Sequence, residues 1–193
     1  STYHPYEVME SGSPSVLSPL YDEGIRPAVN LASSVKFDGG TGKLSNPYTI
    51  KGDKDDASKN DLLTTRISGE YINFDNTKYR IVGIEEIGGQ KLTKVIMADY
   101  TKNSNAIAES VTFGVTDDNS GTIFTTESGI GEYLNNWYTG TSINSTYKSM
   151  IETNGIVWYQ GPTDGINDDY TKSKQGTAVS ATIGLGRYGE MFT

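Results

Sequence analysis

The chain has 193 residues, no cysteine, a single histidine and a formal net charge of −8. The negative charge argues against nucleic acid and anionic membrane surfaces as partners, because both would repel the protein. With no cysteine, and with His4 as the sole histidine, the sequence excludes zinc–thiolate sites, iron–sulfur clusters, cysteine nucleophiles and sites built from several histidines.

No stretch approaches the roughly 18–20 apolar residues of a membrane span, so we expect no membrane insertion. The chain begins at Ser1 without a methionine, and we interpret it as a mature or excised fragment. Glycine and tyrosine are abundant, with 22 and 13 copies. That composition is typical of many short strands joined by polar turns, so we expect a β-rich domain.

The first part of the chain contains one clear strand pattern. Residues 1–24 carry three prolines and are expected to be irregular. Residues 25–31 indicate a buried strand, in which Pro27 predicts an edge position or a bulge because proline cannot donate to a ladder. A short strand at 46–50 follows a glycine-rich turn. Residues 51–61 are charged and lack apolar anchors, which is typical of a linker.

A hairpin pattern follows this linker. Residues 71–74, 79–84 and 92–97 are rich in β-branched and aromatic side chains and alternate in polarity. Asp75 begins one turn between them, and Gly88 begins the other. The spacing predicts a three-stranded antiparallel meander.

Two short helices and a further strand are predicted after the meander. Residues 129–137 and 145–152 each place their apolar side chains on one helical face, and 156–159 indicate an apolar strand. The predicted fold class is α+β, a mainly antiparallel sheet with two short helices. We divide the chain into a closing strand segment at 1–50, the linker, and a main β-rich domain at 62–193.

Two groups of motifs resemble a known family. One is the string Gly24-Ile25-Arg26-Pro27-Ala28-Val29-Asn30-Leu31, and the other combines Tyr79-Arg80-Ile81-Val82-Gly83 with a final Gly-Leu-Gly-Arg-Tyr-Gly-Glu-Met segment. Both are similar to extracellular domains of Gram-positive bacteria that recur in surface and pilin-associated proteins. The resemblance implies a C-type-lectin-like fold and an extracellular or cell-surface location.

The order of these motifs departs from the family, in which the segment with the Arg-Pro strand comes last rather than first. Three explanations are open. The fold is circularly permuted, which is tolerated where termini lie close together. The chain is a window cut across two tandem repeats. Alternatively, residues 1–50 complete the sheet of a neighbouring subunit, which builds filaments because an unpaired strand is a template for another chain.

The leading functional hypothesis is that the chain is a structural subunit of an extracellular bacterial surface protein or filament and assembles by β-strand complementation. On this hypothesis the chain is not an enzyme. Its partners would be identical subunits or tandem repeats. The side chains expected to carry assembly belong to the first strand, and they are Ile25, Arg26, Pro27, Val29 and Leu31.

The alternative is an adhesin module that binds a glycan or protein of the host or cell surface. Exposed tyrosines and an arginine are the candidate ligand-binding residues, because aromatic faces stack on sugars and arginine binds anions: Tyr138, Tyr159, Tyr170 and Arg187. A polar loop offers oxygen ligands for Ca²⁺, the one cofactor considered: Asp164, Asn167, Asp168 and Asp169. We expect Trp137 and Trp158 in the core, and a structural ion pair or carbonyl contact for Arg26.

Overall fold

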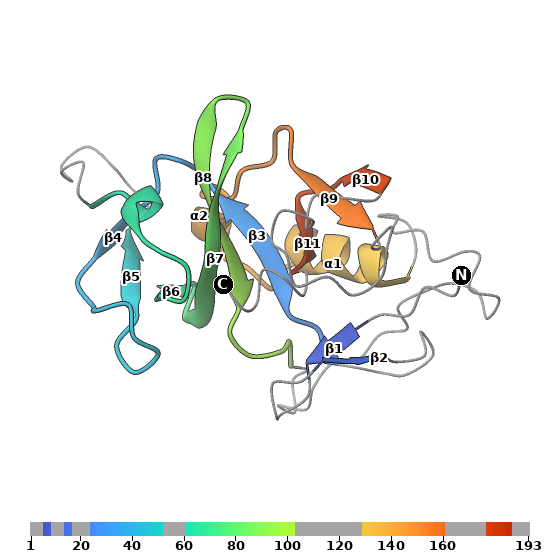
Figure 1. Ribbon diagram of the computed structural model, residues 1–193, viewed down its shortest axis with the longest axis horizontal. Helices are drawn as coiled ribbons and strands as arrows, with labels where there is room; N and C mark the ends of the chain where they lie inside the picture. The colour runs from blue at the N-terminus through green and yellow to red at the C-terminus, as the bar shows by residue number, and fades with distance from the viewer. Residues whose placement is uncertain are drawn as a thin grey trace.

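The computed structural model describes residues 6–8, 14–16, 24–51, 61–102, 129–160 and 177–186. Within these residues, seven strands form one sheet in the order β11-β3-β8-β7-β6-β5-β4 (Figure 1). Its strands are β3 (Pro27–Leu31), β4 (Lys36–Asp38), β5 (Tyr48–Lys51), β6 (Tyr71–Phe74), β7 (Thr77–Ile87), β8 (Gln90–Met97) and β11 (Ile183–Leu185).

The predicted three-stranded meander is confirmed and forms the centre of this sheet. β6 pairs antiparallel with β7, and β7 pairs antiparallel with β8. Asp75 and Asn76 turn the chain between β6 and β7 with φ of 49° and 59°. Two consecutive left-handed residues give a hairpin turn whose twist matches that of the flanking strands. The register shifts between Ile81 and Gly83, which marks a bulge in β7.

The strand with the Arg-Pro motif lies inside the sheet. β3 pairs antiparallel with β8 on one side and with β11 on the other. The prediction that Pro27 marks an edge or a bulge is therefore wrong. Pro27 is the first residue of β3, a position where the missing N–H is tolerated even in an interior strand.

The segment that contains β3 also reaches the opposite end of the sheet. β4 and β5 pair antiparallel, and β5 then pairs in parallel with β6. Residues 27–51 therefore supply strands on both sides of the meander, with β3 next to β8 and β5 next to β6. In Figure 1, β4 and β5 lie at the left of the sheet and β3 lies to the right of β7 and β8.

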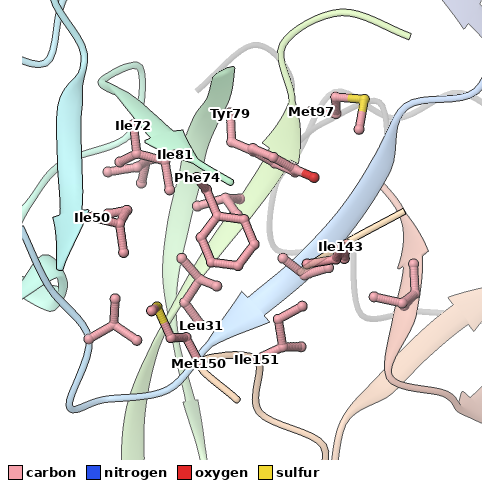
Figure 2. Close-up of a cluster of buried hydrophobic side chains, with 14 of the residues drawn as sticks. Leu31, Ile50, Ile72, Phe74, Tyr79, Ile81, Met97, Ile143, Met150 and Ile151 are labelled. Carbon is pink, nitrogen blue, oxygen red and sulfur yellow. The ribbon is translucent and has the colours of Figure 1, made fainter. Parts of the chain in front are cut away.

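One face of the sheet carries the larger hydrophobic cluster. Helix α1 (Gly129–Thr139) contributes buried Ile130 and Leu134, and Met150 and Ile151 follow helix α2 (Ser145–Lys148). Figure 2 shows the ring of Phe74 among Met150, Ile151 and the labelled side chains of the strands. Burial of large apolar side chains on this face is the main source of stability, at roughly 1.5–3 kcal/mol for each fully buried Leu, Ile or Phe.

The opposite face of the sheet is covered by a separate hairpin. β9 (Val157–Gln160) and β10 (Thr177–Ser180) pair antiparallel. Trp158 of β9 and the preceding Ile156 pack with Ala28, Val82, Leu92 and Ile96 in a second hydrophobic cluster. The sheet is therefore buried on both faces in its central part, with α1 against one face and β9 against the other.

The remaining elements are small. β1 (Tyr6–Val8) and β2 (Pro14–Val16) form a hairpin of their own, and the 3₁₀ turn η2 spans Leu63–Thr65. α2 is shorter than the predicted helix at 145–152, because Ile151 leaves the helix to form an antiparallel bridge with Leu31 of β3. Across the described residues, no helix is both long enough and apolar enough to cross a membrane.

The described elements form a mainly β structure with one main helix, α1, and this is consistent with the predicted α+β class. Of the two predicted short helices, the second is reduced to the four residues of α2.

Candidate functional site

The predicted assembly strand corresponds to β3, which lies between β11 and β8 in the sheet. Every residue of β3 from Pro27 to Leu31 is buried, and Ile25 just before it is also buried. Val29 and Leu31 point into the larger cluster with 0% exposure. A strand with such side chains is stable only when both of its faces and both of its edges are covered.

Both edges of β3 are paired within the chain. β8 covers one edge along Ala28–Leu31, and β11 covers the other along Pro27–Val29. Beyond the end of β11, the segment that follows α2 pairs with the same edge of β3. The N–H of Glu152 donates to the carbonyl of Asn30 at 2.8 Å, and the N–H of Ala32 donates to the carbonyl of Met150 at 2.9 Å.

Arg26 anchors the start of this strand. Its Nε donates a hydrogen bond to the carbonyl of Met97, at the end of β8, at 2.8 Å. Burial lowers the pKa of Arg26 below its ordinary value, with nearby Arg80 adding to the effect. The contact is of the carbonyl-binding kind expected for a structural arginine, and it closes the end of the β3–β8 pair.

Of the predicted ligand-binding tyrosines, Tyr138 and Tyr159 lie in the described residues. Tyr138 is half-buried and packs against the larger cluster, and Nζ of Lys148 lies 5.8 Å from its ring centroid. Tyr159 is half-buried in β9, opposite Ala178 of β10. The structure does not bring these two side chains into one site, because α1 and β9 lie against opposite faces of the sheet.

Several predicted site residues lie outside the described residues, namely Tyr170, Arg187 and the proposed calcium ligands Asp164, Asn167, Asp168 and Asp169. Among the residues that are described, no group of three or more His, Asp or Glu side chains could hold a metal ion. The tryptophans follow the prediction. Trp158 is buried, and Trp137 is partly buried against the larger cluster.

Sequence reasoning missed a buried polar group between β7, β8 and β9. Nζ of Lys94 lies 3.3 Å from Oε1 of Glu85, and both side chains are less than a tenth exposed. The same Nζ lies 4.7 Å from the ring centroid of Trp158, an attractive position for a cation over an aromatic face. A signal was present in the sequence, because the alternation of β8 puts Lys94 on the same face as Leu92 and Ile96.

A second polar group that was not predicted from the sequence lies at the end of the sheet formed by β4 and β5. The guanidinium of Arg66 lies 5.2 Å from the ring of Phe37 and donates to the hydroxyl of Tyr48 at 3.2 Å. That hydroxyl donates to Oε1 of Glu70 at 2.9 Å, and Oε2 of Glu70 accepts from the N–H of Ile67. These contacts fix β4 and β5 to the turn that precedes β6.

Comparison of the chain with family models, with curated proteins and with solved structures finds no match. The resemblance to Gram-positive surface domains therefore stays a prediction.

Proposed function

We propose that the chain is a structural module of an extracellular bacterial surface protein, with a C-type-lectin-like fold, and that it assembles with copies of itself by exchanging strands rather than acting as an enzyme. The observation that carries the proposal is the position of residues 27–51. This one segment supplies β3 beside β8 and β5 beside β6, so it completes the meander from both sides.

A segment placed in this way is suited to exchange between copies. The pairing that β3 makes with β8 and β11, and that β5 makes with β6, can be made equally with the same strands of a second copy. Exchange of identical elements costs little free energy, because every native contact is made again. Exchange also turns a chain whose β3 pairs with its own sheet into a subunit whose β3 pairs with the sheet of its neighbour. Strand complementation builds assemblies in this way.

The burial of β3 explains why an exchanged strand would hold. Val29 and Leu31 are fully buried, and each contributes roughly 1.5–3 kcal/mol when it leaves water. The backbone of β3 pairs with both neighbouring strands. A copy whose site was left empty would expose two strand edges and a large apolar surface, so an unfilled site is strongly unfavourable.

Disulfide trapping tests the exchange directly, because the chain has no cysteine of its own. Thr49 of β5 and Asn73 of β6 are register partners, so the double variant Thr49→Cys/Asn73→Cys places two thiols on neighbouring strands. We expect oxidised, oligomeric fractions from size-exclusion chromatography to run as covalent dimers and larger species on a non-reducing denaturing gel. Adding a reductant should return them to monomers.

A matched control uses a pair inside the exchanged segment. Asp38 of β4 and Thr49 of β5 are register partners within residues 27–51, so Asp38→Cys/Thr49→Cys should give cross-linked monomers whether or not the segment exchanges. The proposal is wrong if the first variant also gives only cross-linked monomers in oligomeric fractions. A preparation that remains strictly monomeric by chromatography and electron microscopy would equally overturn it.

A further inference from the structure

Two arginines share one face of the sheet at the end where β7 begins and β8 ends. Arg80 of β7 is the register partner of Ile96 of β8, and Ile96 is the register partner of Ala28 of β3. Directly opposed residues have their side chains on the same face, so Arg80 lies on the face where Ala28 and Ile96 pack. The alternation of β3, continued back by one residue, puts Arg26 on this face as well. In Figure 1 this is the lower end of the central strands.

Tyr71 belongs to the same cluster. It is the register partner of Arg80, so its side chain lies on the same face. Burial is the largest influence on the pKa of Arg26 and lowers it, while Tyr71 raises this pKa and Arg80 lowers it. Charges at a surface influence one another mainly within about 10 Å. The side chains of Arg26, Arg80 and Tyr71 therefore converge, although their strands are not all neighbours in the sheet.

Arg26 has hydrogen-bond donors to spare. Its Nε donates to the carbonyl of Met97 at 2.8 Å, but neither of its Nη groups is hydrogen-bonded within the part of the chain that the structure describes. The hydroxyl of Tyr71 has no hydrogen bond within that part either. The planar fork of a guanidinium matches the two oxygens of a carboxylate. A half-buried cation, which has lost part of its hydration, is stabilised by an anion in this position.

The carboxylate of Asp99 influences Arg26 but is bound elsewhere. It raises the pKa of Arg26, yet its Oδ2 accepts from Nζ of Lys102 at 2.7 Å and its Oδ1 accepts from the N–H of Tyr100 at 2.9 Å. Across the described ranges from residue 24 to residue 186, no ion pair joins Arg26 to a carboxylate. The chain has a net charge of −8, so a cluster of cations is opposite in sign to the molecule as a whole. Such a cluster attracts anions locally.

An exposed aromatic side chain, Tyr100, lies beside this cluster. It is 41% exposed. A Cβ added at Gly24 would lie 3.0 Å from Cβ of Tyr100, and the N–H of Thr101 donates to the carbonyl of Ile25 at 2.8 Å. The tyrosine therefore stands next to the backbone that leads into Arg26. Aromatic side chains beside a few placed polar groups are the usual lining of a small-molecule site, and aromatic faces stack on sugar rings.

We propose that this cluster binds the carboxylate of an acidic sugar. The two Nη groups of Arg26 hold the two carboxylate oxygens, and the hydroxyl of Tyr71 donates to one of them. Arg80 adds positive charge, and Tyr100 stacks on the sugar ring. This binding site goes beyond the structural role proposed above. It also does not depend on strand exchange, because Arg26 meets the same face of β7 and β8 whether β3 comes from its own chain or from a second copy.

An NMR titration of the full chain with sodium glucuronate at low ionic strength tests the site. We expect saturable shifts in the amide signals of residues 97–102 and in the Nε–H signal of Arg26. Glucose lacks the carboxylate and acetate lacks the ring, so each should bind roughly tenfold more weakly or worse. Absence of a saturable shift, or shifts confined to other parts of the sheet, would overturn the proposal. So would glucose, acetate or inorganic phosphate binding as tightly as glucuronate, since the site would then not recognise an acidic sugar.

Variants separate recognition from simple charge attraction. Arg26→Lys keeps the charge but loses the fork, so it should weaken glucuronate binding by roughly tenfold. Tyr71→Phe keeps the ring but loses the donor, and it should weaken binding by about threefold or more. Lys91→Gln is the control, because Lys91 is exposed at the opposite end of β8 and its loss should leave binding unchanged. Arg80→Gln removes the same charge within the cluster and should weaken binding.

Equal affinities of the Arg80→Gln and Lys91→Gln variants would overturn the proposal, because binding would then follow net charge rather than the cluster. Undiminished binding in Arg26→Lys would overturn it as well. Circular dichroism checks that each variant is folded. If Arg26→Lys does not fold, the titration of the unaltered chain and of Tyr71→Phe decides the matter.

Discussion

At the scale of single residues, the contact between Trp158 and β11 shows how tightly one face of the sheet is packed. The ring of Trp158 lies on Gly184, and its Nε1 donates to the carbonyl of Ala181 at 2.7 Å. A Cβ added at Gly184 would collide with the ring atoms Cδ2, Cε3 and Cε2. Glycine is therefore required at this position for close approach rather than for backbone conformation.

Gly184→Ala should lower the free energy of unfolding by about 1–3 kcal/mol, because the indole ring or β11 must move to make room. Gly186→Ala is the matched control, since its Cβ would meet only the side chain of Ile96, whose Cδ1 is the nearest atom. In urea denaturation, Gly184→Ala should have a clearly lower free energy of unfolding than Gly186→Ala. Equal free energies would show that the ring of Trp158 is not held against the sheet.

Tyr79 supplies a prediction about alkaline pH. Burial raises the pKa of Tyr79 above its ordinary value of 10.0, with a smaller effect from the carboxylate of Asp75. The folded protein therefore keeps this proton at pH values where the unfolded chain has released it. The stabilisation is fully present below pH 10.0 and is lost progressively as the pH rises beyond that value.

Tyr79→Phe should therefore remove part of the loss of stability that the original chain shows above pH 10.0, while remaining folded at neutral pH. Urea denaturation of both proteins on either side of that pH measures this change in the free energy of unfolding. In an alkaline titration followed by phenolate absorbance, the folded variant should contain one fewer tyrosine that resists ionisation than the original protein does. Identical pH profiles for the two proteins would contradict the assignment.

The sequence allowed some residue roles to be predicted and not others. Trp158 in the core and Arg26 on a carbonyl follow from their own local patterns, since each lies in an apolar run. The buried contact between Lys94 and Glu85 does not, because it depends on which residue of β7 faces which residue of β8. A shift of that register by one residue would move Lys94 away from Glu85, and the sequence does not state the register.

At the scale of elements, the turn between β6 and β7 connects the meander to the helical side of the molecule. Asp75 adopts a positive φ, and its Oδ2 accepts a hydrogen bond from the N–H of Asn144 at 2.6 Å. Asn144 is the N-cap of α2 and accepts in turn from the N–H of Thr146. One short turn therefore fixes a hairpin and also positions the helix that lies over it.

Asp75→Ala should lower the free energy of unfolding by roughly 2–3 kcal/mol, because alanine is strained at positive φ and cannot accept from Asn144. Asp75→Gly loses the hydrogen bond but not the favourable backbone conformation, so it should cost less. Urea denaturation of the two variants separates the effects. A glycine variant as unstable as the alanine variant would mean that backbone strain contributes nothing here.

Local elements were also the ones that the sequence predicted well. The meander was predictable because its strands are consecutive and its turns carry Asp75-Asn76 and Gly88-Gly89. The parallel pairing of β5 with β6 was not, since it joins strands on either side of a charged stretch that resembles a linker. The length of α2 was overestimated, because its last predicted turn makes a tertiary bridge to β3 that overrides helical periodicity.

At the scale of the whole molecule, the sheet makes residues 27–51 and 61–102 a single cooperative unit. β3 and β8 share four register pairs, and β3 is buried on both faces. We expect the backbone amides of Val29 and Val95 to exchange with solvent only through global unfolding, at the same free energy. Native-state hydrogen exchange measures this. Faster exchange at Val29 than at Val95 would show that β3 opens independently.

The placement of β3 between β8 and β11 also governs the order in which the protein can fold during synthesis. β3 leaves the ribosome before either of its partners, β8 and β11. Strands with distant partners fold late, since the intervening chain must first be brought together. The Arg-Pro segment therefore remains an unpaired, apolar strand until β8 and β11 have been made, and during that interval a neighbouring nascent chain can capture it.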